Sequence, residues 1–323
     1  MPTIVGTDTI TSISNRIVMP VITDQVYGSV ALLWRLNGAN KKRYAGGTHL
    51  EAPFITSIYS ATGEYQGYDL LDVTPEDNIK NGGWDMKEYY ASMSLSGRDI
   101  ARANSQQAIA SLIDVQWSQA RMGRANKLGT DLWGSAVSNS KKIDGLQDAV
   151  DDAGVATSYA GLTRAANTYL NCTDDSTSAT LTLSVLRSLV SNATKGGHSP
   201  TILFSRKEQY NRYWALLQPY QRFPTEGMRD EQLAAAGFKN LLFDQIPWVL
   251  DDKCFDGPNT SNSAIVALNE EYIDLAIFNG VDFAMQPFRV PVNQNAMVGL
   301  IFWYGNVVVT APQTCGKLTN ISA

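Results

Sequence analysis

The sequence has few of the side chains that build metal centres and disulfide frameworks. It contains only 2 histidines and 3 cysteines among 323 residues. His49 and His198 are far apart, and Cys172, Cys254 and Cys315 form neither a Cys-x-x-Cys pair nor an even set. Zinc ligands usually come in closely spaced pairs, and a disulfide framework needs paired cysteines. We therefore expect no zinc site and no disulfide framework.

Long apolar segments are also missing. Hydrophobic residues make up 44% of the chain, yet there is no run of about 18 apolar residues such as a membrane span requires. The first residues, MPTIVGTDTITSIS, lack the basic start and continuous apolar stretch of a secretory signal. We expect no membrane partner and synthesis in the cytoplasm.

Positive charge is not in excess. Charged residues are 18% of the chain, the formal net charge is −5, and the isoelectric point is near 5.1. A surface of this kind does not attract nucleic acid strongly as a whole, although the cluster at residues 41–43 could do so locally. Any contact with DNA is expected to be weak and non-specific.

Recognised catalytic motifs are absent: there is no phosphate-binding loop, no Gly-x-Ser-x-Gly, no His-Glu-x-x-His and no Gly-x-Gly-x-x-Gly. Asp251, Asp252 and Asp256 could hold calcium, but their spacing is not that of an EF-hand, and such residues usually cap helices or form turns. Glu270 and Glu271 have no evident partner for a carboxylate pair. We predict no enzyme activity, no metal ligand and no cofactor.

The most informative region that is present is a long, polar, glycine-punctuated stretch over residues 36–96. Two extended runs, 41–59 and 84–95, flank a tip whose glycines and Pro75 favour a chain reversal. The return run alternates, with Tyr89, Ala91, Met93 and Leu95 on one face. A two-stranded ribbon is marginal alone in water. It must therefore lie on the body of its own domain or on an adjacent subunit.

Helical patterns precede and follow this hairpin. Residues 1–20 read as an extended arm, and apolar spacing from Thr23 to Trp34 predicts one short helix. After the hairpin, residues 96–99 have the form of a capping box and open a long helix that continues to about Leu128. Its polar face is expected to carry Arg102, Gln106, Ser118, Gln119 and Arg121.

A second domain is indicated after a shift toward Gly, Ser, Asn and Asp at residues 129–161. Helices are predicted at 180–194 and through the aromatic segment 210–217. Strands are predicted at 201–204, 246–250, 264–268, 283–290 and 297–310. The expected class is α+β with a mainly antiparallel sheet.

Aromatic residues near the hairpin allow two interpretations. Trp84, Tyr89 and Tyr90 could form a platform on which a sugar or a base stacks. Aromatic side chains are equally favoured on strands and at protein interfaces. We favour the interface, and a carbohydrate-active enzyme or binding module remains the alternative from another class.

The order of arm, extended hairpin, long helix, glycine-rich hinge, α+β domain and terminal strands resembles the major capsid proteins of tailed bacteriophages, whose fold is named after phage HK-ninety-seven. Individual strings resemble the family as well: IDGL at 143–146 and YAGLTR at 159–164, where the spine helix leads into the axial domain, and FDQIPWVLDD at 243–252, ALNEEYI at 267–273 and WYGN at 303–306 in the late strands. The likeness covers nearly the whole chain.

The resemblance implies a division of the chain. Residues 1–35 would be the N-terminal arm and short helix, 36–96 the extended loop over a neighbouring subunit, and 97–142 the spine helix of the peripheral domain. Residues 143–280 would form the axial domain, and 281–323 the strands that return to the peripheral domain. Side chains expected between subunits are Tyr59, Tyr65, Tyr68, Trp84, Tyr89, Arg102 and Arg121.

The same resemblance implies a function and partners. Copies of the chain would form hexamers and pentamers of an icosahedral shell around double-stranded DNA, located in the virion and assembled in the host cytoplasm. A portal protein, a scaffolding protein and a decoration or cement protein would be further partners. Because the arm begins almost at Met1, the scaffold is expected to be a separate protein. An encapsulin-like shell around cargo protein is the nearer alternative.

Overall fold

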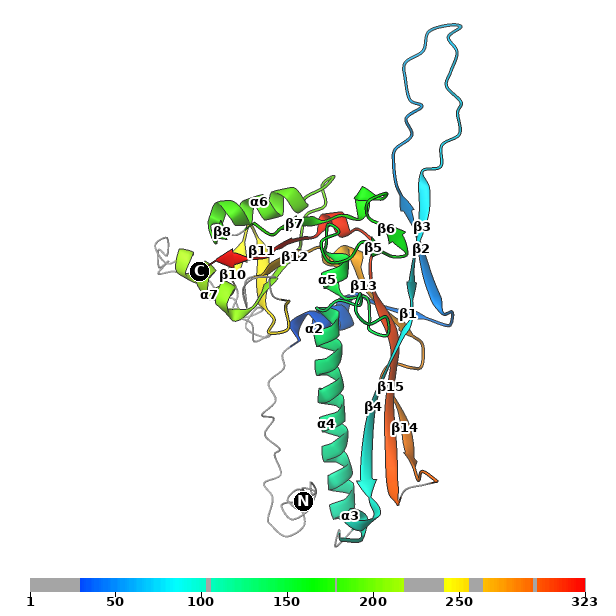
Figure 1. The fold of residues 1–323 in the computed structure, drawn as a ribbon, viewed down its shortest axis with the longest axis vertical. Helices are drawn as coiled ribbons and strands as arrows, with labels where there is room; N and C mark the ends of the chain where they lie inside the picture. The colour runs from blue at the N-terminus through cyan, green and yellow to red at the C-terminus, as the bar shows by residue number, and fades with distance from the viewer. Residues whose placement is uncertain are drawn as a thin grey trace, which may run out of the picture.

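The computed structural model describes residues 30–102, 106–177, 179–217, 241–255, 264–292 and 295–322. Two sheets lie on either side of one long helix, and a hairpin extends well beyond both (Figure 1). The predicted arm, 1–20, and the start of the predicted helix at Thr23 lie outside these residues. The later part of the predicted helix lies in α2 (Ala31–Ala39). Across the described segments, no helix combines the length and apolarity needed to cross a membrane.

The first sheet is organised around one long strand, β15 (Ala296–Val309). It pairs antiparallel with β4 (Lys87–Ser96), β13 (Ile273–Phe278) and β14 (Ala284–Arg289), and β1 (Lys41–Tyr44) adds to β13 in parallel. Along β4 the more buried and the exposed residues alternate, as predicted, because every second side chain faces the body. The alternation prediction is confirmed, and β4 is also the strand that contacts the long helix.

The long helix is described as α3 (Gly97–Arg102) and α4 (Gln106–Leu132). The 27 residues of α4 span roughly 40 Å at 1.5 Å per residue, so the helix runs the length of the first sheet. It ends at Leu132 rather than near Leu128, because Leu128, Leu132 and Trp133 are buried in the main core. Ser118, Gln119 and Arg121 are exposed, as the predicted polar face requires.

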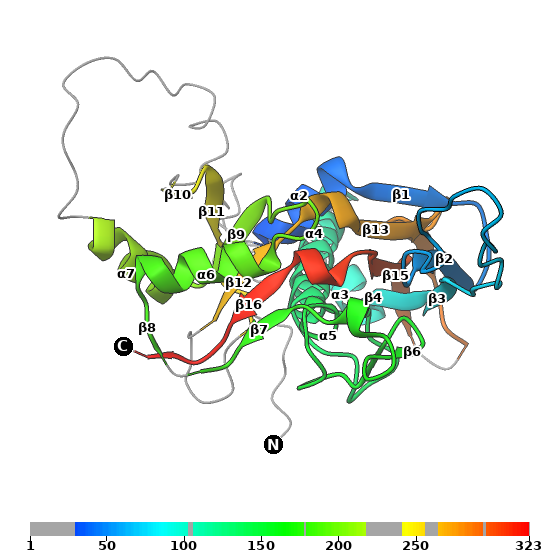
Figure 2. The ribbon, with the colours of Figure 1, turned by 90° about the horizontal axis from the view of Figure 1, so that it is seen from above.

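The second sheet has the strand order β10 (Leu241–Phe243), β11 (Ile246–Leu250), β9 (Ile202–Ser205), β12 (Ile265–Leu268), β16 (Gly316–Leu318) and β7 (Thr173–Asp175). Helices α6 (Leu183–Ala193) and α7 (Lys207–Leu217) pack against one face. Seen from above, this layer lies on one side of α4 and the first sheet lies on the other (Figure 2). The predicted α+β class, with mainly antiparallel pairing, is confirmed.

Alternation along the central strands explains why the second sheet is covered on both faces. Leu203 and Trp248 belong to the cluster under α6 and α7, whereas Ile202, Phe204 and Val249 belong to the larger core that reaches α2 and the end of α4. Successive side chains of a strand point to opposite faces. A sheet with both faces apolar therefore ties the two halves of the molecule together.

Short elements fill the connections. They are α5 (Leu146–Ala149), the pair β5 (Ser158–Tyr159) and β6 (Leu162–Thr163), the pair β8 (Ala179–Thr180) and β17 (Ile321–Ser322), and the 3-10 turns Thr168–Leu170, Glu270–Tyr272 and Pro312–Thr314. Helix α6 begins at its N-cap Thr182, whose hydroxyl accepts the Val185 N–H. Gly196 and Gly197 follow its end with positive φ, the backbone conformation that glycine favours after a helix.

The predicted hairpin is corrected in three respects. Leu36 lies inside α2 rather than at the start of the hairpin. The outbound run 41–59 is broken at Gly47, whose φ of 105° favours glycine, into β1 and β2 (His49–Ile55). The return run 84–95 lies mostly in β4 and pairs with β15, so the actual hairpin is β2 with β3 (Ile79–Asp85).

The expected boundaries of the chain's later parts also differ from the sheets. Strand β13, placed by sequence in the segment 143–280, lies in the first sheet. Strand β16, placed among the terminal strands that return to the peripheral domain, lies in the second sheet, and β17 pairs with β8. Periodicity identifies a strand, but it does not identify the partner strand, which here is far away in sequence.

Candidate functional site: the extended loop

Residues 56–78 form the tip of the extended loop and lie far from the rest of the molecule (Figure 1). Large apolar side chains in and beside this tip are exposed: Ile55, Ile58, Tyr59, Tyr65, Tyr68, Leu70, Leu71, Val73 and Ile79. Soluble monomers rarely expose apolar groups in such a continuous set, and larger exposed patches mark interaction sites. The tip is therefore the strongest candidate for a binding surface in the described chain.

Polar contacts hold the tip in shape. Both carboxylate oxygens of Glu76 lie 3.1 Å from the Ser60 N–H, and Glu76 also accepts from the Ser60 hydroxyl and, at 2.9 Å, from the Asn78 amide. The Ser60 hydroxyl, the Asn78 amide and the Ser60 N–H together lower the pKa of Glu76 to about 2. The apolar side chains of the tip take no part in these contacts and are exposed.

The base of the loop is fixed to the chain's own core. Trp84 is only 2% exposed and packs edge-on against Phe54 and Tyr159, with ring centroids 6.0 Å apart in each pair. The Gly83 N–H donates to the Ala160 carbonyl at 2.9 Å. A Cβ at Gly83 would lie 1.9 Å from the His49 ring, so a larger residue there would displace this side chain.

The structure separates the seven expected contact residues into groups. Tyr59, Tyr65 and Tyr68 are exposed on the tip. Trp84 is corrected: it is a core residue that anchors the loop, and the sequence missed this because Tyr159, its partner, comes from a distant segment.

Tyr89 makes contacts within its own subunit, and its expected contact between subunits stays a prediction. It is half-buried, its ring packs against Trp303, and its hydroxyl donates to Asp131 at 3.0 Å and accepts the Ile143 N–H at 3.1 Å. Burial raises the pKa of Tyr89. With Trp84 and Tyr89 both engaged in internal contacts, the stacking platform considered for a sugar or a base does not form.

The two arginines lie on the long helix. Arg121 is exposed on α4. Arg102 is the last residue of α3, and its side chain falls outside the described part of the structure. Contacts of both residues between subunits stay predictions.

The carboxylates considered for metal or catalysis have structural roles. Asp251 is buried, and its carboxylate accepts the Leu32 N–H at 3.2 Å near the start of α2, the Trp133 indole N–H at 3.1 Å and the Lys253 N–H at 2.9 Å. Glu270 forms a bidentate ion pair with Arg35, whose Nε and Nη2 donate to its two carboxylate oxygens at 2.7 and 2.8 Å. Asp256 lies outside the described residues.

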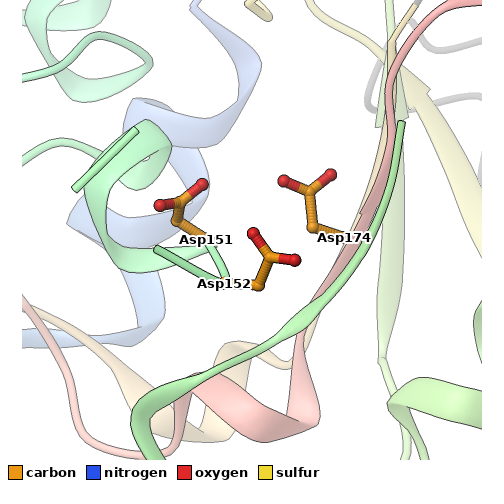
Figure 3. Close-up of side chains that lie close together, drawn as sticks. All are labelled: Asp151, Asp152 and Asp174. Atoms are coloured by element: carbon orange, nitrogen blue, oxygen red, sulfur yellow. The ribbon is translucent and has the colours of Figure 1, made fainter. Parts of the chain in front are cut away.

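A different acidic cluster, which sequence reading did not single out, consists of Asp151, Asp152 and Asp174 (Figure 3). One carboxylate oxygen from each lies within 4.8 Å of the others. Such a group could hold a cation, but the buried ammonium of Lys317 lies 2.8 Å from Asp151 and 2.9 Å from Asp174. Asp151 and Asp174 are therefore in an ion-pair network in which the chain supplies its own cation, and Asp152 lies exposed beside it.

A hollow of about 310 Å³ lies where the base of the loop meets the segment after α4. Asp144, Asp148 and His49 are among its lining residues. Burial raises the pKa of Asp144 and of Asp148. The Asn306 amide closes one side, since it donates to Asp144 at 2.7 Å and to the Asp85 carbonyl at 2.8 Å. This contact orients the loop on the body.

The arrangement of a long helix beside one sheet, a second sheet covered by helices, and an extended hairpin that leaves the body matches solved structures of phage capsid proteins. The resemblance inferred from the ordered motifs is thus confirmed at the level of fold. No protein-family model matches the sequence, and no curated protein matches it by sequence.

Comparison with solved structures supports this class over nearly the full chain. The cyanophage A-1(L) capsid protein matches with a TM-score of 0.70 and 12% identity, covering 95% of this chain and 96% of that chain. The capsid of a native GTA particle matches with 0.60 and 12%, covering 95% and 96%. The SrpI encapsulin of Synechococcus elongatus matches with 0.57 and 11%, covering 94% and 92%.

Proposed function

We propose that this protein is the major capsid protein of a tailed bacteriophage, and that its copies assemble into hexamers and pentamers of an icosahedral shell around double-stranded DNA. The observation that carries the proposal is the apolar, exposed tip of a loop anchored at its base, on a fold shared with capsid shells. The role is structural rather than catalytic.

The tip lies beyond the body of its own subunit, so its apolar side chains can be covered only by another molecule (Figure 1). A specific interface buries roughly 1,600 Å² in total, and an extended loop adds contact area that the compact body lacks. Many moderate contacts repeated around a closed shell give a stable assembly. The neighbour that covers the tip is therefore a second copy of this chain.

The proposal includes further expectations about location and partners. The shell would be assembled in the host cytoplasm and be part of the virion, with a portal protein at one vertex, a separate scaffolding protein during assembly and a decoration protein outside. A net charge of −5 suits an inner wall that meets packed DNA through weak, non-specific contacts.

Deleting residues 61–75 tests the proposal. The deletion rejoins the chain close to the contact between Ser60 and Glu76, and it leaves β2, β3 and the base intact. We expect a soluble, folded subunit that forms no closed shells, as seen by negative-stain electron microscopy and sedimentation. Normal shells from this variant would contradict the assignment of the tip as an interface.

A second variant keeps the length of the loop. Tyr68, Leu70 and Val73, which are among the exposed tip residues, are each replaced by serine, while Ser60 and Glu76 are kept. The control is Val137→Ser, which replaces another apolar side chain, 65% exposed, away from the tip. We expect the triple variant to lose shells and the control to retain them.

An encapsulin-like compartment is a second candidate because the SrpI encapsulin shares the fold. It would use the same loop contacts but enclose protein. The contents of purified shells separate the two: nuclease-protected DNA supports the capsid, whereas a co-purifying cargo enzyme supports the compartment. Neighbouring genes for a portal and terminase, or for a cargo enzyme, give an independent answer.

A further inference from the structure

Two cysteines lie side by side at the edge of the second sheet. Strands β16 and β7 are parallel, with Gly316 opposite Thr173 and Lys317 opposite Asp174. One residue earlier on both strands, the same register places Cys315 opposite Cys172. The Thr173 N–H donates to the Cys315 carbonyl at 3.4 Å, so the two chains are still in contact next to this position.

The two thiols share one face of the sheet. The side chains of Lys317 and Asp174 meet at 2.9 Å, and Cys315 and Cys172 come two residues before them on the same strands. Because side chains at i and i+2 lie on one face, both thiols are on the face that carries this ion pair. They pack against the same core cluster and are near enough to influence each other's charge.

The backbone separation fits a covalent bond between them. Paired strands lie about 4.7–4.9 Å apart, and disulfides join residues whose Cα atoms are about 4.4–6.8 Å apart. The pair lies one residue before the first paired residues of both strands. None of the three cysteines, all of which are in the described part of the chain, is in a disulfide here.

We propose that Cys172 and Cys315 are a dithiol that stays reduced in the cytoplasm and closes to an intrasubunit disulfide in an oxidising medium. Cys172 is partly exposed and reacts first, whereas Cys315 is fully buried and resolves the intermediate. The inference concerns the single subunit, and it holds whether or not the subunit forms a shell.

With a small disulfide as oxidant, the reaction balances as two exchanges. The Cys172 thiolate attacks one sulfur of the small disulfide and expels one thiolate, which leaves a mixed disulfide on Cys172. The Cys315 thiolate then attacks the Cys172 sulfur and expels the second thiolate. Two small thiols are produced, and the two protons lost by the cysteines are taken up by them.

Burial makes the closure slow rather than impossible. It raises the pKa of both thiols, so little thiolate is present at neutral pH. The bond, once made, encloses a loop of about 140 residues, and long loops gain most from cross-linking. In an oxidising medium it would join β16 to β7 covalently and stiffen the sheet that links the two halves of the molecule.

The test uses the full chain, purified under reducing conditions and then incubated with oxidised glutathione at pH 8. We expect the intact mass to fall by the mass of two hydrogens and a non-reduced digest to contain the cross-linked peptides of Cys172 and Cys315. The thermal unfolding midpoint should rise by several degrees and return on adding a reductant.

Variants identify the pair. Cys254→Ala removes the third cysteine and should leave the mass loss and the thermal shift unchanged. Cys315→Ala should stop at a single glutathione adduct on Cys172. Stable glutathione adducts on the unsubstituted chain without loss of two hydrogens, or no reaction over days while the urea-unfolded chain reacts, would overturn the proposal. The mass loss and the cross-linked peptides of the unsubstituted chain test the proposal even if a variant folds poorly.

Discussion

At the scale of single residues, the most consequential side chain is Lys317. It is 2% exposed and pairs with two carboxylates that come from different segments, Asp151 and Asp174. Burial opposes its charged form, but the hydrogen bonds and charges of the two carboxylates outweigh burial and raise its pKa. A buried ion pair adds little net stability, yet removing one partner strands the other charge.

Replacing Lys317 by methionine should therefore be strongly destabilising. We expect a loss of about 3–5 kcal/mol in the free energy of unfolding, because two carboxylates lose their buried cation. Urea unfolding followed by circular dichroism measures this loss. The control is Arg187→Met, whose pair with Asp244 is exposed and should contribute about 1 kcal/mol or less. Equal effects of the two substitutions would contradict the assigned role of Lys317.

The same network predicts a pH dependence. Burial alone would raise the pKa of Asp151, but the hydrogen bonds from Lys317 and from the Ala156 and Val155 N–H groups lower it. A lowered folded-state pKa contributes stability above the unfolded value, about 3.9, and this is lost as pH falls further. Burial raises the pKa of Asp174, so its contribution to stability changes with pH in the opposite direction and favours the folded state as the pH falls. Asp151→Asn should flatten the acid loss, measured as urea midpoints between pH 5 and 3.

At the scale of elements, the extended loop divides into an anchored base and a preset tip. The base is held by Trp84, Phe54 and the backbone bond from Gly83 to Ala160. The tip depends on the contacts around Glu76 instead. Changes in the two parts should therefore have separable effects, with the base governing the stability of the subunit and the tip governing association.

Glu76→Ala should loosen the tip while the body remains folded. The lost acceptor frees the Ser60 and Asn78 donors, so amide hydrogen exchange should accelerate at residues 57–78 and remain unchanged in α4. The control is Glu64→Ala, an exposed carboxylate of the same tip. Since the pKa of Glu76 is lowered to about 2, the contacts are complete above the ordinary value near 4.3 and fade toward pH 2. Equal exchange in both variants would refute the role of Glu76.

The sequence predicted the helices and strands better than it predicted which strands pair. The alternation of β4, the strand at residues 246–250 and the polar face of α4 were all readable, because each depends on local periodicity. The pairing of β4 with β15 was not, since it joins residues about 200 positions apart. Trp84 was misassigned for the same reason: its burial depends on Tyr159, and nothing in its own strand reveals that contact.

At the scale of the whole molecule, the second sheet unites distant parts of the chain. Strand β16 lies between β12 and β7, and it brings Lys317 to its two carboxylates. The sheet is apolar on both faces and carries the core that reaches α2 and α4. Its integrity is therefore a condition for the entire body.

Ending the chain after residue 311 should abolish folding. The truncation removes β16, exposes the edges of β12 and β7, and leaves Asp151 and Asp174 without Lys317. We expect an insoluble product, or a soluble one without a cooperative thermal transition by circular dichroism. A truncated chain that unfolds cooperatively near the full-length midpoint would show that β16 is dispensable. The control is Lys195→Ala, an exposed site beyond α6.

The position of β16 in the order of synthesis has a consequence for production in the cell. Every other strand of the second sheet leaves the ribosome before residues 316–318, so the sheet cannot close on a nascent chain that has not reached them. A prematurely terminated chain would carry the exposed apolar side chains of the loop tip without a folded body. A chain that stops before Leu318 leaves β12 and β7 without the strand that they share, so the cell would obtain a folded body only from chains translated through that residue.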